Sequence, residues 1–275
     1  MRRHWKAVAR ATAVLLTVFV LATTAEVQEP RPAQVPRTSD GKPDLSGVYQ
    51  ASSRRGAWDF EVPGEQPGQS ARSTPVNSAR PEPIPFRPEA RQRAQEILNR
   101  RSVDDPATLC LPQPSPRMTT VALFPIQIIQ TPQQMVVMYE YFYEFRVIPT
   151  DGRKLSDDIE PAYLGNPVGR WEGDTFVVDM VGFKPGLWFG NGLVTSDALK
   201  ITERFTRVDR DQINYEAVLE DPNVLTKPYT IRATLMLRES TRLREYSCVE
   251  NNVDPQRYEK LLSNPTTFTR TPPTP

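Results

Sequence analysis

The chain has 275 residues, with 34 Lys and Arg against 33 Asp and Glu, a net charge of +1, two cysteines and one histidine. This near balance argues against a nucleic-acid-binding protein, which needs a clustered basic surface. The histidine is His4. A chain that loses its N-terminus therefore keeps no imidazole, which excludes Ser-His-Asp and Cys-His catalysis and histidine-ligated metal sites.

The N-terminus has the pattern of a secretory signal peptide. Four basic residues precede an uncharged apolar run over residues 11–22, and small residues follow up to Ala25. A membrane-spanning helix needs roughly 20 apolar residues, more than this run offers. We predict cleavage near Ala25, a periplasmic or secreted protein, and no membrane span after processing. Removing the four basic residues of 1–25, which hold no acidic residue, takes the net charge from +1 to −3.

Residues 26–87 are rich in Pro, Gly, Ser, Arg and Gln and hold few large apolar side chains. Such a stretch buries too little surface to offset its ordering entropy, so we predict an extended arm. One island, residues 43–49, follows the Asp40-Gly41 turn and has the pattern of a short strand. At the other end, residues 265–275 are predicted to be a loose tail.

Between them, residues 88–264 are predicted to form a single β-rich domain that opens with a helix over 88–101. Pro88 suits the first helical position, and one apolar face recurs at Ala90, Ala94, Ile97 and Leu98. A second short helix is expected after Asp254-Pro255.

Cys110 and Cys248 are the two cysteines. An even number in an exported chain predicts a disulfide bond. Closing so long a loop stabilises the fold by about 5 kcal/mol in the chain-entropy model. Two free thiols are the alternative.

From Met118 onward the apolar period changes to two. Strand patterns cover residues 124–129, 134–139, 143–148, 168–171, 175–181, 199–208, 213–219, 229–238 and 243–249. Strands at hairpin spacing predict one antiparallel meander, and closing it into a barrel removes its unpaired edges. We therefore predict a mostly β fold, either an up-and-down (lipocalin-like) barrel or a strongly curved sheet, with two short helices. A β-sandwich is the alternative.

Several motifs occur in a fixed order: residues 169–179 (GRWEGDTFVVD), 199–209 (LKITERFTRVD), 220–222 (EDP), 227–229 (KPY) and 245–251 (EYSCVEN). Together they resemble those of a large, mostly uncharacterised family of exported bacterial proteins. The resemblance spans roughly residues 40–262 and implies an exported location and a β-rich fold. It supplies no catalytic residues that could be assigned to positions of this chain. Relatives often carry histidine where this chain has Lys200 and Val249, which implies that any chemistry of those histidines is absent here.

Glu203 is the minority candidate for a catalytic residue. Strict alternation places it on the same strand face as Leu199, Ile201 and Phe205. A carboxyl group on an apolar face either pairs with a cation or lines a cavity, where burial would suit it to proton transfer. We favour a structural pair with an arginine from a neighbouring strand, such as Arg170 or Arg146.

Further ligand-binding candidates are Arg170, Trp171, Trp188 and Tyr139. Tyr139 belongs to an aromatic group with Tyr141, Phe142, Tyr143 and Phe145, of which about half can point inward. Trp188 and Phe189 lie in a glycine-rich loop and would form either an exposed lid or a packed plug.

Asp157, Asp158 and Glu160 lack the spacing of a calcium-binding loop, so we predict a solvated loop, no metal site and no cofactor.

For the function we favour binding of a small apolar or aromatic molecule in the barrel. A histidine-independent enzyme of the lyase, isomerase or hydratase type, working with carboxylate and arginine groups, is one alternative. An envelope protein with a structural or partner-binding role is another. The sequence leaves the oligomeric state open, and also the choice between the general secretory and the twin-arginine route.

Overall fold

The computed structural model describes residues 35–51, 83–100, 105–120, 124–155, 159–190, 192–250 and 252–263. The predicted signal peptide over 1–25 lies outside the described residues. So do the predicted loose tail over 265–275 and most of the predicted arm.

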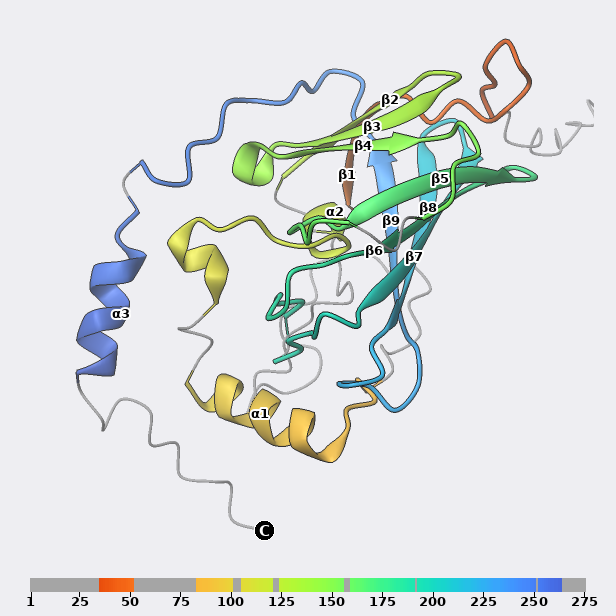
Figure 1. Ribbon diagram of the computed structural model, residues 1–275. Helices are drawn as coiled ribbons and strands as arrows, with labels where there is room; N and C mark the ends of the chain where they lie inside the picture. Colours follow the sequence, from red (N-terminus) through yellow and green to blue (C-terminus); the bar gives the residue numbers. More distant parts are fainter. Residues whose placement is uncertain are drawn as a thin grey trace, which may run out of the picture. The chain divides into compact units, whose positions relative to one another are not determined.

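The described residues form nine strands in one antiparallel sheet (Figure 1). The strands are β1 (Gly47–Ala51), β2 (Ile126–Gln130), β3 (Gln134–Tyr139), β4 (Phe145–Pro149), β5 (Asn166–Glu172), β6 (Thr175–Val181), β7 (Lys200–Asp209), β8 (Gln212–Glu220) and β9 (Tyr229–Leu237). Their order in the sheet is β4-β3-β2-β1-β9-β8-β7-β6-β5. Consecutive strands are therefore neighbours except at one point, between β4 and β5.

The sheet curves until it is nearly closed, because its two edge strands, β4 and β5, approach each other. Gly169 on β5 makes the approach possible: a Cβ there would lie 2.9 Å from Cγ2 of Ile148 on β4 and 2.5 Å from the ring of Phe176. The other join is hydrogen-bonded, since Tyr49 of β1 pairs with Leu237 of β9. The prediction of an antiparallel up-and-down sheet that closes or nearly closes is confirmed.

Alternation of side chains explains how the wall encloses a core. On β7, Ile201, Glu203, Phe205 and Arg207 are buried, and the residues between them are partly exposed. The β5–β6 hairpin turns at Gly173, whose φ of 59° suits glycine. The inward apolar residues of the eight strands other than β5 form one apolar cluster, and Trp171 of β5 packs against it.

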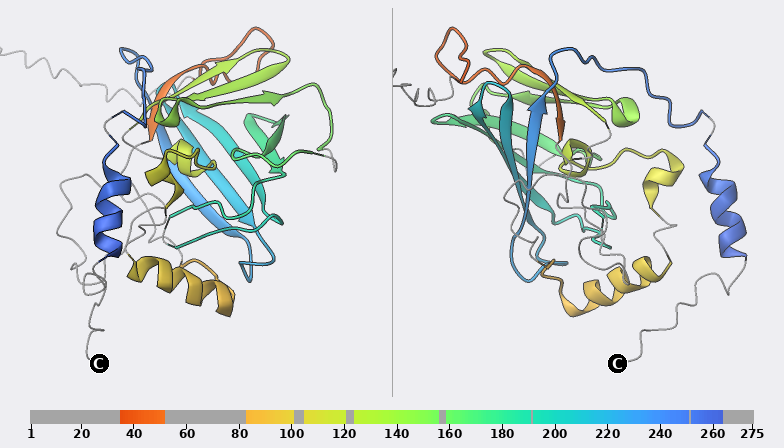
Figure 2. Two further views of the ribbon diagram at one scale, coloured as in Figure 1. Left: turned by 60° about the vertical axis from the view of Figure 1, so that its left-hand side comes forward. Right: turned by 180° about the vertical axis from the view of Figure 1, so that it is seen from behind.

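Three α-helices and two short 3-10 helices accompany the sheet among the described residues (Figure 2). They are α1 (Pro88–Asn99), η1 (Pro106–Leu109), α2 (Arg117–Thr120), η2 (Tyr141–Tyr143) and α3 (Asp254–Leu262). Both predicted helices are present, and α1 buries Ala94 and Ile97 as its apolar face requires. None of the helices in the described part of the chain is long and apolar enough to span a membrane.

The strand predictions are wrong at two places. Residues 243–249 form no strand, because β9 is already flanked by β8 and β1 and no free edge is left beside it. The β region does not begin at Met118, which lies in α2 and is buried. It begins at β1, which belongs to the expected island of the arm and pairs with both β2 and β9.

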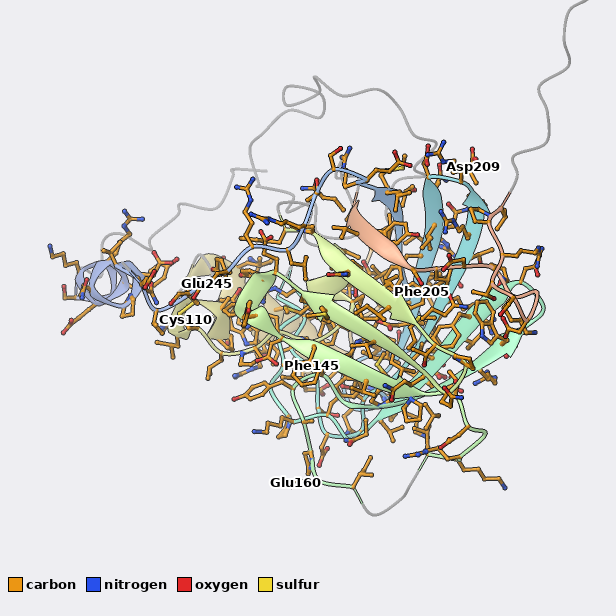
Figure 3. The ribbon with its side chains drawn as sticks, turned by 90° about the horizontal axis from the view of Figure 1, so that it is seen from above. Cys110, Phe145, Glu160, Phe205, Asp209 and Glu245 are labelled. Atoms are coloured by element: carbon orange, nitrogen blue, oxygen red, sulfur yellow. A yellow bond between two sulfur atoms is a disulfide. The ribbon has the colours of Figure 1, made fainter. Side chains whose placement is uncertain are left out.

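The predicted disulfide is present. Cys110 and Cys248 are bonded, with their Cα atoms 5.6 Å apart. Cys110 ends η1, and Asn252, just before α3, donates a hydrogen bond to the carbonyl of Thr108 over 2.9 Å. In Figure 3 Cys110 and Glu245 lie close together, where the segment after β9 reaches the disulfide. The bridge therefore fixes this segment to the η1 region.

Candidate functional site

Glu203 lies inside the barrel and pairs with an arginine from across it. The carboxylate is fully buried, and its Oε2 accepts a hydrogen bond from Nη2 of Arg146 over 2.9 Å. Arg146 comes from β4 and Glu203 from β7, which are not neighbours in the sheet. Of the two expected arginines, Arg146 is the partner and Arg170 is not. The expectation of a partner from a neighbouring strand is wrong, because β4 reaches Glu203 across the barrel interior.

Four more polar side chains complete what we call the interior network. Tyr215 on β8 donates to Oε1 of Glu203 over 2.6 Å, and the hydroxyl of Ser115 donates to the same oxygen. Thr119 on α2 lies 3.0 Å from the Ser115 hydroxyl and 3.3 Å from the Tyr139 hydroxyl. The interior network consists of Ser115, Thr119, Tyr139, Arg146, Glu203 and Tyr215.

Electrostatics keep the two phenols of the interior network protonated. Burial raises the pKa of Tyr215 well above 10, and the neighbouring Glu203 charge raises it further. Burial likewise raises the pKa of Tyr139. For Arg146, burial lowers the pKa, but the Glu203 charge and the two tyrosines outweigh it and leave the pKa raised. The guanidinium thus stays charged.

The six side chains of the interior network are shielded from solvent. No member is more than 3% exposed, and Nη1 of Arg146 donates to the sulfur of Met180 over 2.9 Å. Nε of Arg146 is buried without a hydrogen-bond partner among the described residues. A buried ion pair that is broken by removal of one partner is costly, so this network holds β4 and β8 to β7.

Trp188 is buried in the loop after β6 and not exposed as a lid requires. Its side chain is 8% exposed, and Phe189 is fully buried. The loop is held by a hydrogen bond from the Phe189 amide to the Leu193 carbonyl and by Arg117, which donates to the Trp188 carbonyl over 3.2 Å. The expectation of a packed plug fits this arrangement, and an exposed aromatic lid does not.

A cleft of about 170 Å³ lies beside Trp188. Its walls come from two loops, residues 111–113 after η1 and residues 184–188 after β6, together with Pro106 and Tyr163. The walls hold prolines, leucines and two aromatic rings, and Lys184 is the one charged residue among the described lining residues. Its ammonium lies 4.4 Å from the centre of the Tyr163 ring.

Arg170 and Trp171 lie elsewhere, on β5. Arg170 points outward and forms ion pairs with Glu172 and Asp179. Trp171 is half-buried, packs its ring 5.2 Å from that of Phe176 and carries the Lys42 ammonium at 5.9 Å. The five predicted ligand-binding residues therefore occupy three separate places: the interior network, the cleft and the β5 hairpin.

The aromatic group does not divide as alternation along one strand predicts. Tyr139 points into the barrel, whereas Tyr143 and Phe145, which have the same parity, are 68% and 63% exposed, because the chain turns through η2 between β3 and β4. Tyr141 and Phe142 are partly buried and pack against Tyr246 from the segment after β9.

In the predicted solvated loop, Glu160 is exposed, and Asp157 and Asp158 lie outside the described residues. Within the described ranges, no group of three or more His, Cys, Asp or Glu residues is placed to hold a metal ion.

Some key residues were not singled out from the sequence. Arg207 is buried and donates to the carbonyls of Asp44 and Arg210, and the alternation that finds Glu203 also finds it. Asp221, from the EDP motif, is buried and accepts hydrogen bonds from the amide and hydroxyl of Ser196 at 2.7 and 2.8 Å. Ser115 gives no signal, because it lies in a proline-rich passage without periodicity.

Comparison with protein-family models, with curated proteins and with solved structures finds no match to this chain. The resemblance to a family of exported bacterial proteins stays a prediction.

Proposed function

We propose that this protein is exported and binds a small molecule that has an apolar or aromatic body and one anionic group. The observation that supports this most directly is the cleft beside Trp188, which combines proline, leucine and aromatic walls with the single ammonium of Lys184. Binding sites for small molecules typically have mostly apolar walls and a few placed polar groups. The proposal keeps the expected ligand class but moves the expected site from the barrel interior, which packed side chains occupy, to a cleft between loops.

The size of the cleft limits the ligand. An engineered protein cavity of about 150 Å³ holds one benzene molecule, and the cleft measures about 170 Å³. Drug-sized ligands occupy pockets of roughly 300–1,000 Å³. The enclosed part of the ligand is therefore about one ring or a short aliphatic chain.

Charge selects the polar end of the ligand. Lys184 is exposed, and none of the ion pairs among the described residues involves it. Its ammonium can therefore pair with a carboxylate or another anion at the mouth of the cleft, where partial burial strengthens the attraction.

The wall after η1 is held from two sides. Arg117 forms a partly buried ion pair with Asp105 at 2.7 Å and donates to the side chain of Gln113 over 2.6 Å. The Cys110–Cys248 bond anchors the same segment to the chain after β9. Such tethers preorganise a binding site and lower the entropy lost when a ligand binds. A disulfide also fits an oxidising compartment, in line with export.

The test uses two probes that share a ring, phenylacetate with a charge and 2-phenylethanol without one. Protein purified from the periplasm of a bacterial host is titrated with each and followed by ¹H–¹⁵N NMR. We expect phenylacetate to bind about threefold to fivefold more tightly, with shifts at the Trp188 indole, since a charge contact to an exposed ammonium contributes up to about 1 kcal/mol.

Matched variants assign the preference to the cleft. Lys184→Met should remove the difference between the two probes. Lys42→Met should leave it intact, because Lys42 also lies over an aromatic ring but at the β5 hairpin. Equal binding of both probes by the wild-type protein, or none at about 10 mM, would overturn the proposal.

A histidine-independent enzyme has weaker support. The cluster that combines a carboxylate, a guanidinium and phenols is the interior network, and its charged groups are 3% exposed or less. A catalytic group must come within hydrogen-bond reach of its substrate.

A further inference from the structure

The outer surfaces of the two parts of the sheet differ in charge. On β5–β9, outward side chains form ion pairs between strands, such as Arg204 with Glu172 and Arg232 with Glu216. On β2–β4, the outward positions carry no ionisable side chain. We call these positions the uncharged face: Gln127, Ile129, Gln134, Val136, Met138, Phe145, Val147 and Pro149.

The uncharged face is continuous, because its residues are cross-strand neighbours. Ile129 is registered with Val136, which is registered with Val147 on the next strand. Met138 is likewise registered with Phe145. Figure 3 looks onto β2–β4 and labels Phe145 on this surface.

The apolar part of the face is exposed to a degree that is unusual for a sheet. Ile129, Met138, Phe145 and Val147 are each 37–63% exposed. Contiguous exposed apolar patches on soluble proteins mark interaction sites. Aromatic residues and Met are enriched in the cores of interfaces, and charged residues are depleted there.

We propose that the uncharged face is a dimerisation surface that binds the same face of a second copy of this chain. In a twofold interface each patch meets its own copy, so a patch with a net charge would repel itself. This face has no charge to repel. Gln127 and Gln134 lie at its border, and an amide side chain both donates and accepts, so it can pair with an identical group.

Other partners are less well matched to this chemistry. Nucleic acid and anionic membrane surfaces require lysine or arginine, and no outward position of the face provides one. A charged peptide would find no complementary charge either.

The size of the face sets the expected affinity. Three strands span about 10 Å across and about 17 Å along, roughly 170 Å² of sheet per copy before side chains are counted. This is smaller than the roughly 800 Å² that each partner buries in a standard interface. We therefore expect a weak, reversible dimer with a Kd of roughly 0.1–0.5 mM.

Sedimentation velocity of the processed full chain over about 1–500 µM tests this. The wild-type protein should shift from monomer to dimer with rising concentration. Phe145→Lys places like charges against each other and should weaken dimerisation by about 30-fold or more, the effect of losing a hot spot. Val147→Lys serves instead if the first variant does not fold, as judged by circular dichroism.

The matched control is Asn214→Lys, which adds the same charge at an exposed outward position on β8. It should dimerise like the wild type. A wild-type chain that stays monomeric throughout would overturn the proposal, as would a dimer that persists in the lysine variants or is lost equally in the control. Phenylacetate binding is measured separately, so failure of this proposal is distinguishable from failure of the binding function.

Discussion

The barrel has two unlike halves, β1–β4 and β5–β9. The strands of the first half have five or six residues and present mostly uncharged side chains outward, while those of the second half have seven to ten and carry ion pairs. Both halves bury the same kind of apolar inner face. The shared apolar core therefore holds both halves in one fold. The outer side chains do not pack in this core, so their charge can differ between the halves.

Three links join the halves: the β1–β9 ladder, the Arg146–Glu203 pair and the packing of β4 near β5. The disulfide adds a fourth link outside the sheet. If the halves depend on one another, breaking a link should unfold both together, whereas changes on the outer faces should leave the fold intact.

The largest expected effect comes from removing the disulfide. The bond closes a loop with a sequence separation of 138, which corresponds to about 5 kcal/mol in the chain-entropy model. A chain with both Cys110→Ser and Cys248→Ser should lose about 2–5 kcal/mol of unfolding free energy in urea denaturation. Because η1 is tethered by this bond, the double variant should also bind phenylacetate less tightly. An unchanged urea midpoint would show that the disulfide does not contribute to the stability of the fold.

Breaking the interior pair should cost a comparable amount. Glu203→Gln leaves the Arg146 cation buried without its counter-charge, and such changes destabilise by about 3–5 kcal/mol. The double change Arg146→Met with Glu203→Leu removes both charges and should restore much of that loss. Urea denaturation of the three proteins checks this. A Glu203→Gln protein that keeps its stability but loses ligand binding would instead assign Glu203 to a functional cavity.

The smallest effect is expected at the outer ion pairs. Arg204 first, and then Arg170, lower the pKa of Glu172 below its usual value of 4.5. A lowered folded pKa means that the carboxylate favours folding above its ordinary pKa, and that this contribution is lost as the pH falls through the lowered value. In an NMR titration, Arg204→Ala should raise the pKa of Glu172 toward 4.5. The unfolding midpoint should hardly change, because exposed pairs contribute little.

Alternation along a strand is what the sequence predicts best. It places Glu203 inside, because a register error of one residue would expose the whole apolar face of β7. It does not identify the partner, because Arg146 lies far along the chain and reaches Glu203 across the barrel. Arg170 is nearer in sequence but alternates outward, with its neighbour Trp171 facing Phe176.

Loops are predicted less well, for a physical reason. Residues 243–249 have a strand-like composition, but a strand needs an unpaired edge beside it, and the sheet order leaves none next to β9. The walls of the cleft come from two loops that are far apart in the sequence. Neither loop has an apolar periodicity from which its conformation could be predicted. Trp188 was singled out as an aromatic residue in a glycine-rich loop, and Lys184 was not.

The pairing of β1 with β9 also sets an order of events. β1 leaves the ribosome first among the strands, yet one of its two neighbours is the last strand of the sheet. β1 therefore keeps one open edge until β9 is available. Pairings between residues far apart in sequence form slowly. Completion of the barrel is therefore a late step of folding, and the early strands must stay free of wrong partners until then.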